Sequence, residues 1–432
     1  MEKHFFYRSF ASIIILMLSG ILIQGCSPGD FQPTETQTNT LEPSVEPSPT
    51  ILPTATKEPV TELAGQISIW HSFEENEMGS LSAVITNFQD MNPEVEFDVL
   101  YVPHYDLLNK YESSARDGGG PCILIGSADW GPPLFDSNLI QDITQFAEED
   151  FLATVNPIAL GSVQYSDSLI GLPLNTTGVV LFRNQSIIPD APATIDDLVE
   201  FAQQATSGDV VGAYLDYGLF FSGGHLDGVG GQLMDSEGNP TFNDDKGLEW
   251  IELIRRFEEA GPVENNDDND INLFNQGKVG TIIAELWNTS TITEAIGSEN
   301  LVIDPWPTPM SGYVQTENLY LSSNSAEKDL ETCWNFMNFL LTDETQLIFA
   351  DPDMAGFIPS IQGVKLSDPL QMQAMESFSG GAVFPVIPEM NVYWDPVNSA
   401  LLSVIEQGID PADALQTAYD IVVSELEDNP GE

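Results

Sequence analysis

The sequence predicts an α/β protein built as two lobes. From residue 66 onward, short apolar strands alternate with amphipathic helices, which is typical of parallel-type sheets covered by helices. Roughly 370 residues follow the first 63, which suits two lobes of ordinary size. A hydrophobic content of 42% and seven tryptophans supply enough apolar surface for a core in each lobe.

The first half of the body shows this alternation most clearly. The predicted elements are a strand at 66–70, a helix at 78–91, a strand at 95–99, a helix at 105–116 and a strand at 122–125. Leu81, Val84 and Phe88 form one face of the first helix. Right-handed crossovers would make these strands parallel, and ligands of such sheets bind at strand carboxyl ends. Those ends are residues 70–73 and 126–130.

The second half continues the pattern with other elements. We predict strands at 169–174, 178–182 and 279–286, and helices at 194–203, 246–260, 330–341 and 411–426. Asp196 and Asp197 suit the positive amino-terminal end of the helix that Thr194 opens. The sequence has no internal repeat.

The charge of the chain is strongly negative. Lys and Arg number 12 against 67 Asp and Glu, a formal net charge of -55. Such a surface repels nucleic acid and anionic ligands, and it permits neutral or cationic ones. Solubility alone is an equally simple explanation. The sequence also lacks a phosphate-binding loop, a nucleophile elbow and a His/Cys metal cluster, so we expect no cofactor and no metal.

The amino-terminal segment predicts export. Residues 1–25 contain a charged start and an apolar run too short to span a membrane comfortably, and they end just before Cys26. The sequence Ile23-Gln24-Gly25-Cys26 resembles the lipobox of bacterial lipoproteins, although Gln24 departs from the usual residue. We expect Cys26 to be lipidated and to anchor the chain on the outer face of the cell membrane; an uncleaved amino-terminal anchor is the alternative.

Between the anchor and the body we predict a disordered tether, residues 26–64. It is rich in Thr, Pro, Glu and Ser and has no apolar period, so it cannot bury enough surface to fold. Within the body, Cys122 and Cys333 lie in apolar surroundings. We expect two buried free thiols there, with a disulfide as the alternative.

The order of several short motifs resembles family 1 of the extracellular solute-binding proteins, the maltose-binding type that serves carbohydrate ABC transporters. The motifs lie at residues 67–73, 119–124, 171–178, 230–233, 238–243, 274–280, 326–328, 334–336, 341–344, 356–359 and 393–394. Cys122 stands where the family usually has Asp. The resemblance covers nearly the whole body.

The resemblance implies a type II periplasmic-binding-protein-like fold whose lobes are discontinuous, each with a mostly parallel sheet. We expect lobe 1 to comprise residues 65–175 with 319–357, and lobe 2 residues 178–316 with 360–432. It also implies a ligand site between closing lobes and delivery of the ligand to ABC transporter permease subunits. We expect a monomer without enzymatic activity.

A sugar site needs flat apolar faces for stacking and polar groups for the hydroxyls. The segment ends provide both kinds, and the predicted ligand-binding residues are Trp70, His71, Asp129, Trp130, Asn175, Thr177, Glu285, Trp287, Tyr393, Trp394 and Asp395. Trp287 and Trp394 fall at the stacking positions of the family. Trp70 could equally belong to the core, and His71 could be an ordinary loop residue.

We therefore predict a lipid-anchored binding protein for an oligosaccharide or polyol. Three alternatives remain: a binding protein for a cation such as a polyamine or amino sugar, a secreted glycoside hydrolase, and a sensor that signals to a membrane partner. No segment of the sequence identifies the pair of catalytic carboxylates that a hydrolase requires.

Overall fold

A computed structural model describes residues 63–428. The predicted signal peptide, Cys26 and all but the end of the tether lie outside this range, while the last tether residue, Ala64, is already part of the first strand. Below, lobe 1 and lobe 2 denote the predicted residue ranges. In the part of the chain described, no helix combines the length and apolar character needed to span a membrane.

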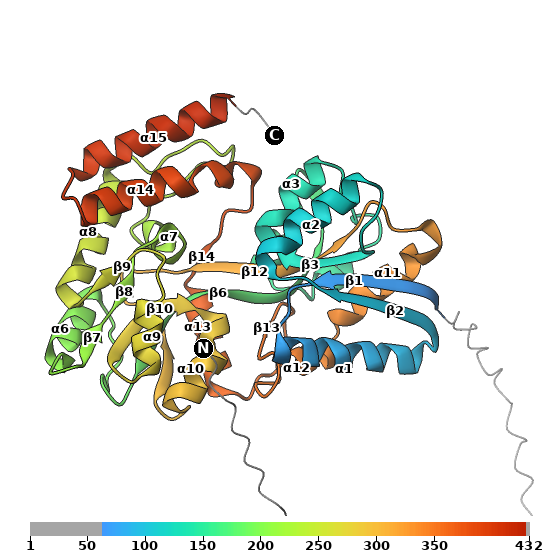
Figure 1. The fold of residues 1–432 in the computed structure, drawn as a ribbon, viewed down its shortest axis with the longest axis horizontal. Helices are drawn as coiled ribbons and strands as arrows, with labels where there is room; N and C mark the ends of the chain where they lie inside the picture. The colour runs from blue at the N-terminus through green and yellow to red at the C-terminus, as the bar shows by residue number, and fades with distance from the viewer. Residues whose placement is uncertain (1–62, 429–432) are drawn as a thin grey trace, which may run out of the picture. The chain divides into compact units, whose positions relative to one another are not determined.

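Lobe 1 has a small parallel sheet with helices around it (Figure 1). Its elements are β1 (Ala64–His71), α1 (Glu75–Met91), β2 (Glu94–Tyr101), α2 (His104–Arg116), β3 (Ile123–Ser127), η1 (Ala128–Trp130), α3 (Gly131–Asp136), α4 (Glu149–Leu152), α5 (Pro157–Gly161), β4 (Gln164–Tyr165), β5 (Ser168–Leu169), α11 (Glu327–Leu340) and α12 (Asp343–Phe349). β1 pairs in parallel with both β2 and β3. The predicted strand and helix order of this lobe is confirmed.

Lobe 2 contains more helices. Its elements are α6 (Ile195–Ala205), β7 (Val211–Ala213), β8 (Leu215–Asp216), α7 (Leu219–Gly228), α8 (Asp245–Ala260), β9 (Val263–Glu264), α9 (Asn269–Asn275), β10 (Val279–Glu285), η2 (Leu286–Asn288), α10 (Thr289–Ile296), β11 (Leu301–Asp304), α13 (Pro369–Ser379), β14 (Ala382–Val383), η3 (Pro388–Val392), α14 (Trp394–Ile405) and α15 (Pro411–Asp428). Thr194 caps α6. Its hydroxyl accepts a hydrogen bond from the Asp197 backbone amide (3.1 Å), and the Asp197 carboxylate accepts one from the Thr194 backbone amide (3.0 Å).

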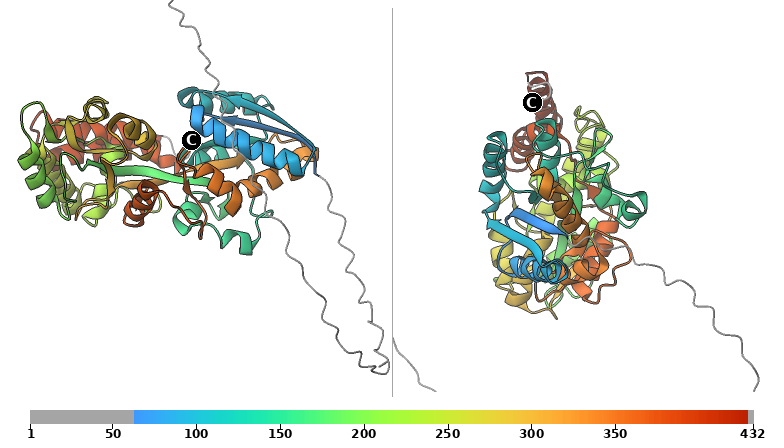
Figure 2. Two further views of the ribbon diagram at one scale, coloured as in Figure 1. Left: turned by 90° about the horizontal axis from the view of Figure 1, so that it is seen from below. Right: turned by 90° about the vertical axis from the view of Figure 1, so that its right-hand side faces the viewer.

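Two long strands continue from one lobe into the other: β6 (Leu172–Asn184) and β12 (Tyr313–Leu321), with the short β13 (Ile358–Pro359) alongside. The sheet order is β2-β1-β3-β12-β6-β10-β7, with β11, β13 and β14 attached to it. Figures 1 and 2 show β6 and β12 running together between the helices of the two lobes. The two strands predicted at 169–174 and 178–182 are thus mostly one strand. The sheet is mixed, because β12 is antiparallel to β3 and β6, and β10 and β11 are antiparallel to β6.

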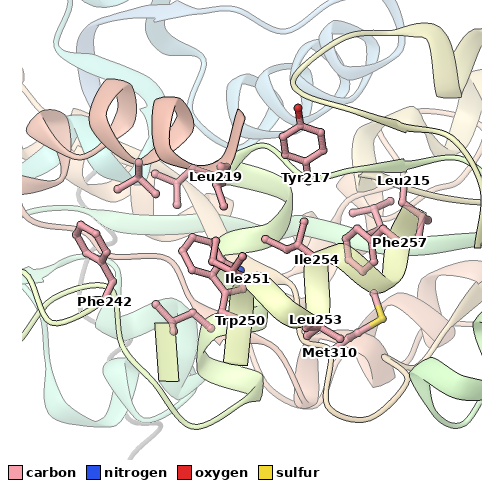
Figure 3. Close-up of a cluster of buried hydrophobic side chains, with 14 of the residues drawn as sticks. Leu215, Tyr217, Leu219, Phe242, Trp250, Ile251, Leu253, Ile254, Phe257 and Met310 are labelled. Atoms are coloured by element: carbon pink, nitrogen blue, oxygen red, sulfur yellow. The ribbon is translucent and has the colours of Figure 1, made fainter. Parts of the chain in front are cut away.

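Separate groups of buried side chains support each lobe. In lobe 1, Leu81, Val84 and Phe88 of α1 are buried as predicted and pack with Ile67 and Phe336. In lobe 2, the apolar face of α8 carries a larger group, including Trp250, Ile254 and Phe257, shown with Leu215 and Tyr217 in Figure 3. The Trp250 indole N–H donates to the Ser222 carbonyl (2.9 Å), so this buried polar atom is satisfied.

Cys122 and Cys333 form a disulfide, with their Cα atoms 6.5 Å apart. The prediction of two free thiols is therefore wrong, and the alternative holds. Both residues are buried, and both β3 and α11 pack against β1, which brings together positions 211 residues apart in the chain. The pairing ties the residue just before β3 to the middle of α11.

Candidate functional site

The strand directions define where a ligand site lies. β12 is antiparallel to both β3 and β6, so β3 runs in the same direction as β6. β10 is antiparallel to β6 and runs the opposite way. The carboxyl ends of β3 and β10 therefore point toward each other along β6.

The register places these two ends close together. Ser127, the last residue of β3, lies opposite Glu317, which in turn lies opposite Asn175 of β6. Glu285, the last residue of β10, lies opposite Val179 of β6. Four residues of β6 separate the two levels, about 13 Å at the usual rise per strand residue. The region between the carboxyl ends of β3 and β10, beside residues 175–179 of β6, is the candidate site.

At the end of β1, Trp70 and His71 face different surroundings. The Trp70 ring is half-buried, and the Lys110 ammonium lies 5.2 Å from its centroid. His71 is fully buried; its Nδ1 accepts the Phe73 amide (3.0 Å), which leaves the proton on Nε2, a buried atom without a partner. Burial lowers the pKa of His71 to about 4, so the ring is neutral at pH 7.

At the end of β3, η1 turns Asp129 and Trp130 in different directions. Trp130 is buried beside His104, with ring centroids 5.1 Å apart, and contributes to the core under α2. Asp129 remains partly exposed, and desolvation raises the pKa of its carboxyl to about 6. Of the two residues, Asp129 is therefore the one available to a ligand.

The two strands that continue from one lobe into the other, β6 and β12, are called the crossing strands, and the place where they pass between the lobes is called the crossing. Asn175 and Thr177 occupy successive positions of the same face of β6. Asn175 is buried and bonded to Glu317, whereas Thr177 is half-buried opposite Gln315. The crossing is tight, because a Cβ on Gly178 would lie 2.2 Å from the Tyr313 carbonyl oxygen. Only a residue without a side chain fits there.

At the end of β10, Glu285 and Trp287 form the lobe 2 side of the candidate site. Glu285 accepts a hydrogen bond from the Asn288 amide group (2.9 Å), and burial raises its pKa above the ordinary value. Trp287 is 53% exposed, unusual for so large an apolar ring. An exposed ring at a strand end offers a stacking surface for a ligand.

The predicted residues at the start of α14 have three different environments. Tyr393 is fully buried, and its hydroxyl donates to the Gly238 carbonyl (2.7 Å), so it supports the core and presents no face to a ligand. Trp394 is half-buried and stacks on Phe384, with centroids 5.9 Å apart and planes at 24°. Asp395 is exposed. Phe384 bonds through its amide to the Val314 carbonyl of β12 (2.9 Å), which links Trp394 to the crossing.

Two residues of this region are absent from the prediction. Glu317 lies on β12 between Ser127 and Asn175, and Glu77 lies in the first turn of α1. Burial and the negative charge of Glu77 together raise the pKa of Glu317 to about 8. The sequence offers one signal for Glu317, which is an acidic residue inside a mostly apolar strand. That signal can be read only after β12 has been recognised as a strand.

Two hollows in the described structure lie away from this region. One of about 450 Å³ is lined by residues that include Leu63, Phe88 and Phe339, and one of about 380 Å³ lies beside Asp142 and Thr144. None of the predicted site residues lines either of them. Within residues 63–428, no three His, Cys, Asp or Glu side chains have the arrangement of a metal site.

Comparisons with known proteins agree with this architecture. A maltotriose-binding protein from Pyrococcus abyssi is 23% identical over 368 residues, covering 79% of this chain and 78% of the relative. A galactooligosaccharide-binding protein from Bacillus subtilis is 22% identical over 389 residues, covering 84% and 89%.

Solved structures show the same fold. A cyclo/maltodextrin-binding protein complexed with maltotetraose superposes with a TM-score of 0.74 at 20% identity, covering 84% of this chain and 97% of that one. A maltose/maltodextrin-binding domain from Bdellovibrio bacteriovorus bound to maltotriose gives 0.71 at 20% identity, covering 84% and 100%. Residues 83–376 match the family described as bacterial extracellular solute-binding protein. The chain belongs to this family of extracellular solute-binding proteins and has its maltose-binding-type fold.

Proposed function

We propose that this chain is an extracytoplasmic, lipid-anchored binding protein that captures an oligosaccharide at the candidate site. The observation that carries the proposal is the convergence of β3 and β10 on the crossing, with the half-exposed Trp287 ring at one of these ends. A ring offers a face for the C–H bonds of a sugar, and the polar groups of Asp129, Thr177 and Glu285 can bond its hydroxyls.

The relatives support this class of ligand. Proteins named for binding maltotriose and galactooligosaccharides match most of this chain, and a relative from Streptococcus pneumoniae is named a maltooligosaccharide ABC transporter solute-binding lipoprotein. By analogy with it, we propose that Cys26 carries the lipid and that the ligand passes to permease subunits of an ABC transporter. The two lobes would close about β6 and β12, removing water from the bound sugar.

Ligand screening tests the proposal. We expect maltooligosaccharides or galactooligosaccharides to raise the melting temperature of the purified chain, because a ligand at 100 times its dissociation constant stabilises a protein by about 2.7 kcal/mol. Calorimetry should give one site per chain, and chromogenic glycosides should stay uncleaved. Absence of binding by every saccharide tested would overturn the proposal, and turnover of a glycoside would replace it with the hydrolase alternative.

A further inference from the structure

Polar side chains follow one another on the face of β12 that points away from Glu317. Thr316, Asn318 and Tyr320 occupy alternate positions of this strand, so they share one face. All three are buried, and Tyr320 packs in the apolar cluster under α2. We call these three residues the polar ladder. A buried polar group destabilises a fold unless it is hydrogen-bonded, so the hydrogen bonds of the ladder decide what it contributes.

The polar ladder is connected from the crossing toward the end of β3. At the crossing, Thr316 lies opposite Thr176 of β6, and its hydroxyl is hydrogen-bonded to that of Ser162 at the end of α5. The Thr316 hydroxyl donates to Asn318 Oδ1 (2.8 Å), and Asn318 Nδ2 donates to the Tyr320 hydroxyl (3.2 Å). Because the Tyr320 oxygen accepts this bond, its own proton is free to be donated elsewhere.

The Tyr320 hydroxyl donates to the turn η1. Its oxygen lies 2.8 Å from the Ser127 carbonyl oxygen and 3.1 Å from the Ala128 carbonyl oxygen. These two carbonyl groups directly precede Asp129, the residue of η1 that is available to a ligand. The Tyr320 ring has little room to move, because a Cβ on Gly131 would lie 3.0 Å from its Cε1 atom. The hydroxyl therefore has a fixed position, and it fixes the backbone that carries Asp129.

We propose that Tyr320 is a positioning residue for saccharide binding, whose hydroxyl, oriented by the polar ladder, holds Asp129 where its carboxyl group meets the ligand. This inference rests on the proposed function and adds a residue that acts through Asp129 without touching the sugar. The turn η1 is three residues long and has no side-chain cap at its start, so an outside donor determines how it is held. An apolar side chain would fill the place of Tyr320 but could not orient these carbonyl groups.

Titration calorimetry with maltotriose and galactotriose tests the inference. Tyr320→Phe keeps the ring and removes the hydroxyl, and we expect it to weaken binding about tenfold, because the carboxyl group of Asp129 is no longer held toward the sugar. Tyr111→Phe is the matched control. Tyr111 is buried in the same cluster, and its hydroxyl donates to the Leu139 carbonyl (2.9 Å), outside η1. This variant should lose comparable stability and keep the affinity of the wild type.

A double-mutant cycle separates positioning from a structural role. In an Asp129→Ala background the carboxyl group is gone, so adding Tyr320→Phe should weaken saccharide binding no further. Asn318→Ala removes the donor to the Tyr320 hydroxyl and should weaken binding in the same direction as Tyr320→Phe. An equal effect of Tyr320→Phe with and without the Asp129 carboxyl group would overturn the inference, as would an equal loss of affinity in Tyr111→Phe.

A second readout needs no ligand. Desolvation raises the pKa of Asp129 to about 6, and NMR of the purified chain with labelled carboxyl groups measures this value. Tyr320→Phe should lower the pKa of Asp129 toward its ordinary value, and Tyr111→Phe should leave it unchanged. An unchanged pKa in Tyr320→Phe would overturn the inference. Absence of binding by every saccharide would reject the proposed function, whereas a pKa change confined to Tyr320→Phe would still support the hold of Tyr320 on Asp129.

Discussion

Asn175 and Glu317 are joined by two hydrogen bonds across the crossing strands. The Asn175 side-chain amide donates to Glu317 Oε2 (3.2 Å), and the Glu317 backbone amide donates to Asn175 Oδ1 (3.3 Å). The pair fixes the carboxyl group of Glu317 at the level where β3 ends. A ligand in the candidate site would thus meet a carboxyl group whose position is set by both strands.

The first prediction concerns this pair. Asn175→Ala removes the donor to Glu317 and leaves its carboxyl group poorly satisfied, so we expect the free energy of unfolding to fall by about 1 to 3 kcal/mol. Urea unfolding measures it. Asn272→Ala, an exposed position of α9, is the control and should change little. Equal stability of both variants would show that the pair contributes nothing.

The second prediction concerns Trp287. Its ring is half-exposed, so Trp287→Ala should leave stability nearly unchanged while weakening saccharide binding at least about tenfold. Trp250→Ala removes a fully buried ring and should instead cost about 3 to 5 kcal/mol of stability. Titration calorimetry and urea unfolding separate the two effects. Unchanged affinity in Trp287→Ala would remove this ring from the site.

The third prediction concerns pH. Burial and Glu77 raise the pKa of Glu317 to about 8, so the folded chain keeps a proton that the unfolded chain has already released. The free energy of unfolding should therefore fall as the pH rises toward 8. The buried His71 acts in the opposite direction, because its pKa is lowered to about 4 from an ordinary value of 6.5. The histidine effect is complete at about pH 7.5, where the ring is neutral in the unfolded chain as well, and the carboxyl effect continues.

Urea unfolding of the wild type and of Glu317→Gln between about pH 6.5 and 8 isolates this contribution, because the other buried carboxyl groups with a raised pKa, Asp216 and Asp270, are the same in both proteins. Glu317→Gln cannot release a proton, so its stability should decline less steeply with pH than that of the wild type. Glu258→Gln changes an exposed position of α8 and loses the same charge, so it is the control and should show the wild-type slope. Identical slopes in all three proteins would mean that the Glu317 carboxyl group titrates near its ordinary value.

The fourth prediction concerns the Cys122–Cys333 disulfide. It closes a long loop between β3 and α11, so replacing both cysteines by Ala should lower the free energy of unfolding by about 2 to 4 kcal/mol. A reducing agent should lower the stability of the wild type and not that of the double variant. Mass spectrometry of unreduced peptides checks the pairing itself, and a product with free thiols at both positions would contradict it.

Local patterns predicted much of the fold. The spacing of Leu81, Val84 and Phe88 gave the buried face of α1, and Thr194 with Asp197 marked the start of α6, because both signals depend on nearby residues alone. Strand β12 was missed, since most of its residues are buried on both faces and show no alternation. The pairing of Cys122 with Cys333 depends on packing across 211 residues, which no local pattern contains.

Local patterns indicate some features of the candidate site and leave others unpredicted. Residues after β1, β3 and β10 could be located because strand ends are visible in the sequence. The exposure of these side chains could not be predicted: Trp287 is half-exposed, whereas Tyr393 is packed in the lobe 2 core, where its hydroxyl donates to the Gly238 carbonyl. Glu317 depends on the register of β12 against β3 and β6, which only the folded chain reveals.

The most direct test of the central claim is a crystal structure of the chain with the saccharide that binds most tightly. We expect the sugar between the carboxyl ends of β3 and β10, with a ring against Trp287 and a polar group within hydrogen-bond distance of Glu317. A sugar bound elsewhere, for example in the hollow lined by Leu63 and Phe339, would contradict this assignment of the site.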